Sequence, residues 1–233
     1  MFKKNFLNYL YIIFLGALSS YSLPPYNYFI INFITFSLFF IFIFKKKKII
    51  LNNKSFFYYG WYFGFGYFLF SLYWIAISLT FDQSFKFLIP VAIILLPAFL
   101  AIFYGLMTYL FSILYSKNVI SSFFIFSILF GTIEFLRGSI LTGFPWNLIS
   151  FSFSNSIYFV QILSIIGTYS FNLICISLFT APSLFILRNS RREIIVCFSF
   201  VFISIAFLLK YTPSQGKLDK LSVFSLIEPE FSG

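Results

Sequence analysis

The chain has 233 residues, of which 61% are hydrophobic and only 9% are charged, and 40 of them are phenylalanine. A soluble domain is roughly half apolar and about a quarter charged, so this composition excludes a protein whose whole surface faces water and requires one that faces lipid. The formal net charge of +10 does not indicate nucleic-acid binding, because the cations stand in short clusters between apolar runs and form no continuous basic face.

Apolar segments follow one another along the chain, and about seven of them approach the ~20 residues that a helix needs to cross a bilayer. These segments exceed the ~10 residues of a membrane β-strand and do not alternate apolar with polar positions. The sequence therefore predicts an all-α fold, a polytopic transmembrane helix bundle of about seven spans with a short C-terminal tail outside the membrane. In chain order the predicted spans are residues 6–23, 28–44, 56–79, 88–115, 119–141, 157–187 and 194–209.

Prolines and cations mark several ends of these spans. Pro24 and Pro25 end the first, which we interpret as an uncleaved helix in preference to a cleavable signal peptide. A run of four lysines at 45–48 ends the second span; it is most simply a topology anchor, with binding of anionic lipid headgroups as the secondary interpretation. The sixth segment is long enough to tilt or break.

The distribution of lysine and arginine over the loops predicts the orientation of the chain. With the N-terminus in the cytoplasm, most cations of the loops lie on the cytoplasmic side and the C-terminus lies outside. The cytoplasmic cations are then Lys3, Lys4, Lys45, Lys46, Lys47, Lys48, Lys54, Lys117, Arg188, Arg191 and Arg192, against Lys86, Lys210, Lys217 and Lys220 on the other side.

The third predicted span carries glycines at a spacing that favours close helix packing. Gly60 and Gly64 are four residues apart, which is the small-xxx-small pattern of membrane helix interfaces, and Gly66 follows. Trp74 stands near the end of the same span. We expect all four residues to have structural roles.

Two ionisable residues, Glu134 and Arg137, fall inside the fifth predicted span. Their separation of three residues puts them on one helix face within pairing distance, and charges at membrane depth usually face a bundle interior or a water-filled cavity. An ion pair that stabilises the fold, an arginine that reaches the headgroups and a contact with a lipid phosphate all remain open.

The segment that leaves the fifth span contains Gly143, Phe144, Pro145 and Trp146. Glycine and proline end the helix there, and the indole of Trp146 combines an apolar ring with one N–H donor, which suits the membrane interface. An ordinary aromatic belt and a lipid-binding role are both compatible with this pattern.

The chain shows no residues that would form a catalytic or metal centre. It has no histidine, and Cys175 and Cys197 lie in apolar runs without a cation or base nearby that would activate a thiol. We therefore predict no metal, no cofactor, no disulfide framework and no catalytic residue in this sequence.

Three motifs taken together resemble one known family. The run from Glu134 through Arg137 to Gly138, followed by Thr-Gly-Phe-Pro-Trp at 142–146, resembles the E-W-L-R-G…T-G-F-P-W signature of bacterial apolipoprotein N-acyltransferases. The Leu-Pro-Pro-Tyr turn around Pro24 and Pro25 and the glycine run from Gly60 to Trp74 are similar to two further segments of that family.

The resemblance implies a bacterial inner-membrane enzyme whose membrane bundle carries a periplasmic nitrilase-like domain. That enzyme transfers an acyl chain from a phospholipid to the N-terminal diacylglyceryl-cysteine of a lipoprotein, through a cysteine thioester with a glutamate base and a lysine. The expected partners are the phospholipid donor, the lipoprotein acceptor and membrane lipids. Trp146, Pro145, Phe144, Arg137 and Glu134 become the candidates for lipid or substrate binding.

By the same resemblance, residues 1–210 are expected to form the membrane domain, and residues 211–233 a linker and the first strand of a truncated nitrilase-like domain. The chain alone would then lack the Glu-Lys-Cys centre and be inactive, and a separately encoded nitrilase-like domain is a possible partner. The alternatives are a non-catalytic lipid-binding scaffold, a decayed remnant and, less favoured, a transporter, because no inverted repeat is evident.

Overall fold

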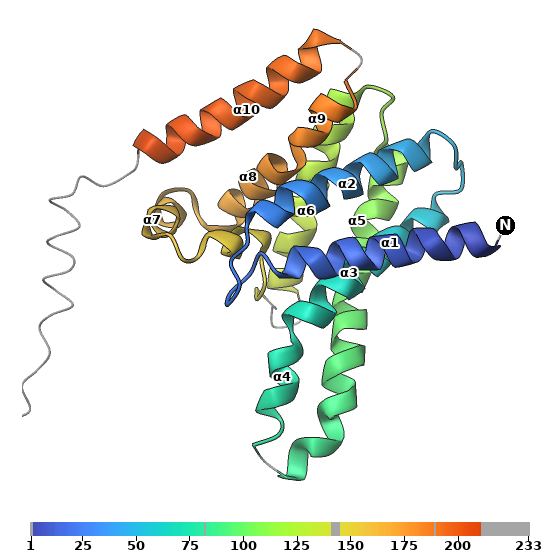
Figure 1. Ribbon diagram of the computed structural model, residues 1–233, viewed down its shortest axis with the longest axis vertical. Coiled ribbons are helices and arrows are strands. Elements are labelled where there is room, and N and C mark those ends of the chain that lie inside the picture. Colours follow the sequence, from blue (N-terminus) through green and yellow to red (C-terminus); the bar gives the residue numbers. More distant parts are fainter. Residues whose placement is uncertain (1, 82, 141–144, 189, 211–233) are drawn as a thin grey trace, which may run out of the picture.

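The computed structural model describes residues 2–81, 83–140, 145–188 and 190–210 of the chain, and the predicted tail at 211–233 lies outside them. The described residues form helices and connecting turns, as the sequence predicted (Figure 1). The longer helices are α1 (Phe2–Ser20), α2 (Ile30–Lys47), α3 (Lys54–Ser71), α5 (Leu96–Leu114), α6 (Val119–Ser139), α7 (Ile157–Ile166), α8 (Thr168–Thr180) and α10 (Arg191–Lys210). The shorter ones are α4 (Tyr73–Ser78), η1 (Gln83–Leu88), η2 (Val91–Leu95), η3 (Ile149–Phe153) and α9 (Pro182–Ile186).

Three helical stretches of the described residues are long and apolar enough to cross a membrane. They are Lys86–Leu114, Val119–Ser139 and Thr168–Ile186. Together with the lipid-facing composition, these stretches identify a helical membrane protein. The count of about seven spans stays a prediction, since the other helices are shorter, less apolar or more charged.

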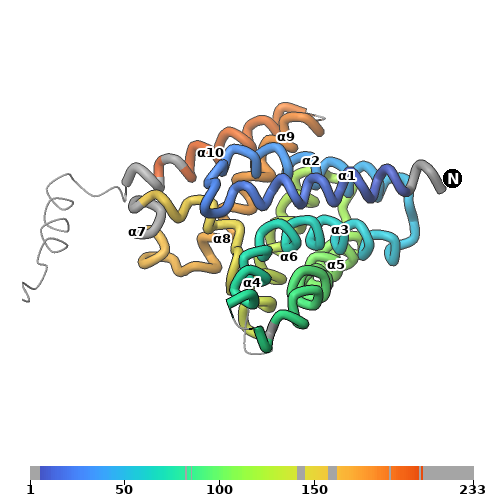
Figure 2. Tube along the Cα trace, turned by 60° about the horizontal axis from the view of Figure 1, so that its bottom comes forward, coloured from blue at the N-terminus to red at the C-terminus, as the bar shows by residue number. Residues whose placement is uncertain are grey.

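Two predicted spans are interrupted in the structure. The third divides at Leu72, where α3 ends and α4 begins with a change of direction. The sixth divides at Gly167, whose φ of +80° is a conformation that glycine adopts readily, and again at Pro182, where α9 starts. As a result α7 is a separate short helix that joins α8 at Gly167 and lies at one end of the molecule (Figure 2).

The core consists largely of stacked and edge-on aromatic rings between α2, α3, α5 and α6. Phe39 of α2 stacks on Phe63 of α3 with ring centroids 4.2 Å apart, and Tyr104 of α5 meets Phe130 of α6 at 4.7 Å. All four side chains are fully buried. Such aromatic pairs contribute about 0.5–1.5 kcal/mol beyond the area that they bury, which explains how a phenylalanine-rich sequence specifies one packing.

Buried hydroxyls connect helices across the same core. Thr108 of α5 donates to the carbonyl of Phe56 in α3 at 2.6 Å, and Ser37 of α2 donates to the carbonyl of Phe179 in α8 at 3.1 Å. In a membrane the hydrophobic effect does not drive helices together, so contacts of this kind and close packing carry the association.

The α3 glycines lie on two opposite contact surfaces. A Cβ atom at Gly60 would collide with the carbonyl of Tyr104 in α5, and one at Gly66 would collide with the carbonyl of Ile13 in α1. At Gly64 the nearest atoms would belong to the side chain of Tyr104, at 3.0 Å. Helix α3 therefore packs backbone-to-backbone between α1 and α5 (Figure 1).

Replacing Gly60 with alanine is expected to lower the free energy of unfolding by about 2 kcal/mol, because the added methyl meets backbone atoms that cannot rotate away. Gly64→Ala is the matched control and should cost clearly less, because its added methyl would lie 3.0–3.1 Å from atoms of Tyr104 and Ala101, whereas the methyl at position 60 would lie 2.1 Å from a carbonyl oxygen. Thermal unfolding of both purified variants in detergent measures the difference. Equal Tm values for the two variants would contradict the proposed tight α3–α5 contact.

Two peripheral features complete the molecule. Helix α4, η1 and η2 form an arm that projects from the bundle, with Phe81 and Phe87 strongly exposed on it (Figure 1). Helix α10 packs on α9 and α8 and ends at the opposite end of the molecule from the N-terminus (Figure 1). It begins with a side-chain cap, in which Ser190 donates to Glu193 at 2.6 Å and lowers the pKa of that carboxyl.

Candidate functional site

Glu134 and Arg137, which their spacing placed within pairing distance, form an ion pair inside the bundle, near the end of α6. Arg137 binds Glu134 through two nitrogens, with Nε–Oε1 at 3.1 Å and a second N–O distance of 2.8 Å. The side chains of both residues are fully buried, and the guanidinium also lies 5.2 Å from the ring centroid of Phe68. A bidentate geometry offsets much of the cost of burying two charges, which is large for either charge alone.

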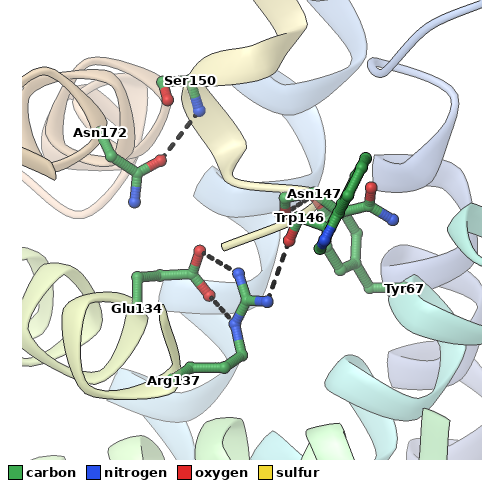
Figure 3. A network of polar contacts seen from close by, with 7 residues as sticks. All are labelled: Tyr67, Glu134, Arg137, Trp146, Asn147, Ser150 and Asn172. Carbon is green, nitrogen blue, oxygen red and sulfur yellow. Dashed lines mark hydrogen bonds and ion pairs between the residues drawn. The ribbon is translucent and has the colours of Figure 1, made fainter. Parts of the chain in front are cut away.

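Arg137 also holds the loop that carries Trp146. A third guanidinium nitrogen donates to the Trp146 carbonyl at 3.0 Å. Figure 3 shows the guanidinium between the Glu134 carboxylate and this carbonyl, with the indole turned away from the ion pair. Because the arginine contacts the backbone of the loop, it positions Trp146 without occupying the space around the indole.

Asn147, the next residue, is bound on two sides by α3. Its carbonyl accepts a hydrogen bond from the Tyr67 hydroxyl at 2.8 Å, and its side-chain amide donates to the carbonyl of Ser71 at 3.1 Å. Its φ of +57° lies in the left-handed region, where asparagine is tolerated better than most residues. The loop is therefore held by hydrogen bonds from both α6 and α3 (Figure 3).

A second polar cluster positions the turn between α1 and α2. The buried side chain of Asn32 accepts a hydrogen bond from Ser19 at 2.6 Å and donates to Ser22 at 2.8 Å and to Ser152 at 3.4 Å. This cluster connects α1, the turn, α2 and η3. Pro24 stands two residues after Ser22 and is joined to Pro25 by a cis peptide bond.

These elements surround a cavity of about 510 Å³ at one end of the bundle. Its walls come from the Pro24–Pro25 turn, from Trp74 and its neighbours after the α3–α4 break, and from Trp146 with Asn147. The two indoles lie 5.8 Å apart at an angle of 52°. Trp146 is 55% exposed and Trp74 40% exposed, so their rings are accessible to a ligand.

The cavity unites residues to which the sequence assigned different roles. Trp146, a binding candidate, lines it together with Pro24, Pro25 and Trp74, which were expected to be structural. Glu134 and Arg137 lie behind the wall and act through the loop. Pro145 is exposed but does not line the cavity, and the predicted positions Gly143 and Phe144 lie outside the described residues.

Sequence reasoning missed Tyr67, Asn147 and Asn32. A tyrosine and two asparagines in apolar surroundings are a usable signal, because buried polar groups need partners. What the sequence could not provide was the partner, which lies 80 residues from Tyr67 and up to 120 residues from Asn32.

The arrangement supports binding more readily than bond-making. Aromatic and proline surfaces suit acyl chains, and the hydroxyls and amide around them can hold an ester or a headgroup. Cys175 and Cys197 are both buried elsewhere in the bundle, and the described residues include no group of three or more His, Cys, Asp or Glu that could hold a metal ion.

Comparison with known proteins gives a consistent result. The family model described as "Apolipoprotein N-acyltransferase N-terminal domain" matches residues 15–181. The apolipoprotein N-acyltransferase of Rhizobium etli is 33% identical over 98% of this chain and 44% of its own length. Those of Rhodopseudomonas palustris and Brucella melitensis are 33% and 32% identical over 76% and 72% of the chain. The chain thus spans less than half the length of these relatives.

Proposed function

The chain belongs to the apolipoprotein N-acyltransferase family, within which it matches the N-terminal domain, and from that premise we propose that it binds the lipid substrates of lipoprotein N-acylation. The phospholipid acyl donor and the diacylglyceryl-cysteine of a lipoprotein share acyl chains joined by esters to glycerol. One aromatic cavity with polar groups in its wall can accept either in turn.

One observation carries the proposal: three segments that are distant in the sequence meet at the same cavity. Pro24 comes from the first loop, Trp74 from the α3–α4 break and Trp146 from the loop after α6. If these residues only stabilised separate helices, there would be no reason for their side chains to share one accessible space of about 510 Å³.

We propose further that this cavity faces the periplasm of a bacterial inner membrane, with the N-terminus in the cytoplasm. The lysines at 45–48 lie at the end of α2 away from the cavity, and the positive-inside rule assigns such clusters to the cytoplasm. The end of α10 lies opposite the N-terminus (Figure 1), in keeping with an external position for residues beyond 210. Reporter fusions after Gly233 should be active outside, and a cytoplasmic signal would contradict this topology.

The chemical step is assigned to a nitrilase-like domain, with residues 1–210 as the membrane domain that presents the lipid. Neither cysteine of the described bundle lies at the cavity: the cavity wall contains serine, tyrosine, tryptophan and asparagine but no thiol. We expect acyl transfer when a separately expressed nitrilase-like domain is supplied, and none from the bundle by itself.

The test uses the purified chain in detergent, a phospholipid with a labelled acyl chain and a diacylglyceryl-cysteine peptide. We expect the chain to bind the lipid saturably. We expect labelled peptide to form only after a nitrilase-like domain is added. Labelled peptide without that domain would contradict the division of roles. Binding without transfer in either case would favour a non-catalytic lipid-binding scaffold.

A further inference from the structure

A second hollow lies at the other end of α2. It is a groove of about 300 Å³ between α1 and α2, lined by apolar side chains that include Tyr11, Leu38 and Phe42 and closed at one end by Lys45 and Lys46. The Tyr11 and Phe42 rings lie 6.0 Å apart. The 18 residues of α2 separate its two ends by about 27 Å, so this groove is distinct from the tryptophan-lined cavity.

The charge at the end of the groove is strongly one-sided. Lys45 is exposed, and the ammonium of Lys46 lies 5.3 Å from the Phe42 ring centroid. Lys47 donates a hydrogen bond to Asn53 in the following loop, and Lys48 lies over the Phe44 ring of α2, so neither lines the groove. Lys45 and Lys46 therefore place positive charge at the end of the groove.

We propose that this groove binds one anionic phospholipid. Its headgroup phosphate would lie against Lys45 and Lys46, and one acyl chain would lie along Tyr11, Leu38 and Phe42. The groove has apolar walls and a cationic end, and an anionic phospholipid has an apolar tail and a negative headgroup to match them. The headgroup of a zwitterionic lipid would instead bring its own positive ammonium close to the two lysines. This site is independent of the proposed substrate cavity.

The test measures lipids retained by the purified full chain in native mass spectrometry, with phosphatidylglycerol or phosphatidylethanolamine added. We expect one phosphatidylglycerol to be retained preferentially. Each lysine near a membrane surface changes the affinity for anionic lipid about fivefold, so Lys45→Gln/Lys46→Gln should weaken retention about 25-fold. The charge-preserving pair Lys45→Arg/Lys46→Arg should retain the lipid.

Two further variants separate a built site from a general attraction of anionic lipid to positive charge. Lys54→Gln/Lys117→Gln removes the same number of cations from the same side and should leave retention unchanged. Leu38→Trp keeps every lysine and fills the groove, and it should lose the lipid. Equal loss in the Lys54/Lys117 variant, full retention in Leu38→Trp, or equal binding of the two lipids would each overturn the proposal.

Two further measurements complete the test: competition of free glycerol phosphate with the retained lipid, and binding of the labelled acyl donor by the variants. If glycerol phosphate displaced phosphatidylglycerol as effectively as the whole lipid does, the site would recognise the phosphate alone, and the proposed lipid groove would be wrong. Donor binding at the tryptophan-lined cavity should be unchanged in Lys45→Gln/Lys46→Gln. In Trp146→Ala the reverse is expected: donor binding should weaken while phosphatidylglycerol is retained. This pair of results would support two separate lipid sites, as proposed.

Discussion

Replacing Arg137 with methionine is expected to lower the free energy of unfolding by about 3–5 kcal/mol, the largest effect of any single substitution considered for this chain. Methionine fills much of the arginine volume, so the loss is mainly electrostatic. It leaves the Glu134 carboxylate fully buried without the two hydrogen bonds that it receives from Arg137. Thermal or denaturant unfolding in detergent measures the loss.

A second variant separates folding from positioning. Glu134→Gln/Arg137→Met carries no buried charge and should recover most of the lost stability, because replacing both partners of a buried ion pair by neutral groups is often tolerated. The Trp146 carbonyl still loses its donor at 3.0 Å. We therefore expect near-normal Tm with weakened lipid binding. Normal lipid binding in this stable double variant would show that Arg137 does not position the loop.

Replacing Trp146 with alanine is expected to weaken binding of the phospholipid donor about thirtyfold, or about 2 kcal/mol, as for an aromatic residue at the centre of a binding surface. The indole is 55% exposed and its side chain is not part of the buried ion-pair network, so stability should change little. The assay is saturation binding of a labelled phospholipid to the purified variant.

The chain offers a matched control for this measurement. Trp61 lies in α3 away from the cavity and donates to the carbonyl of Ala98 at 3.0 Å. Trp61→Phe should therefore bind the donor normally, whereas Trp74→Ala should resemble Trp146→Ala, since the two indoles form one wall. Donor affinity that is unchanged in both cavity variants would refute the assignment of this cavity to the lipid substrate.

The two sets of variants connect the interior of α6 with the accessible surface of the protein. Arg137 contributes to stability through Glu134 and to the site through the Trp146 backbone. A buried residue with both roles gives a different pattern from one with a purely structural role. Lipid affinity and stability fall together in the single variant, whereas in the double variant lipid affinity falls while stability is largely kept.

The sequence alone determined the class of the protein and much of its secondary structure. Lipid-facing composition and long apolar runs indicate helices, because a bilayer admits only helices and closed barrels, and these runs are too long and too uniformly apolar for barrel strands. The helix α6, predicted at 119–141, ends at Ser139. The spacing of Glu134 and Arg137 by three residues placed them on one helix face within pairing distance, but it did not decide between an ion pair and a contact with lipid. The motifs also led to the family.

Tertiary structure decided what those motifs build. Apolar periodicity does not show where a long run bends, so the breaks at Leu72 and Gly167 depend on how the helices pack. No local pattern indicates that Pro24, Trp74 and Trp146 share one cavity, or that Tyr67 and Arg137 hold the same loop from two helices. These contacts join residues far apart in the sequence, and only the packed bundle brings them within bonding distance.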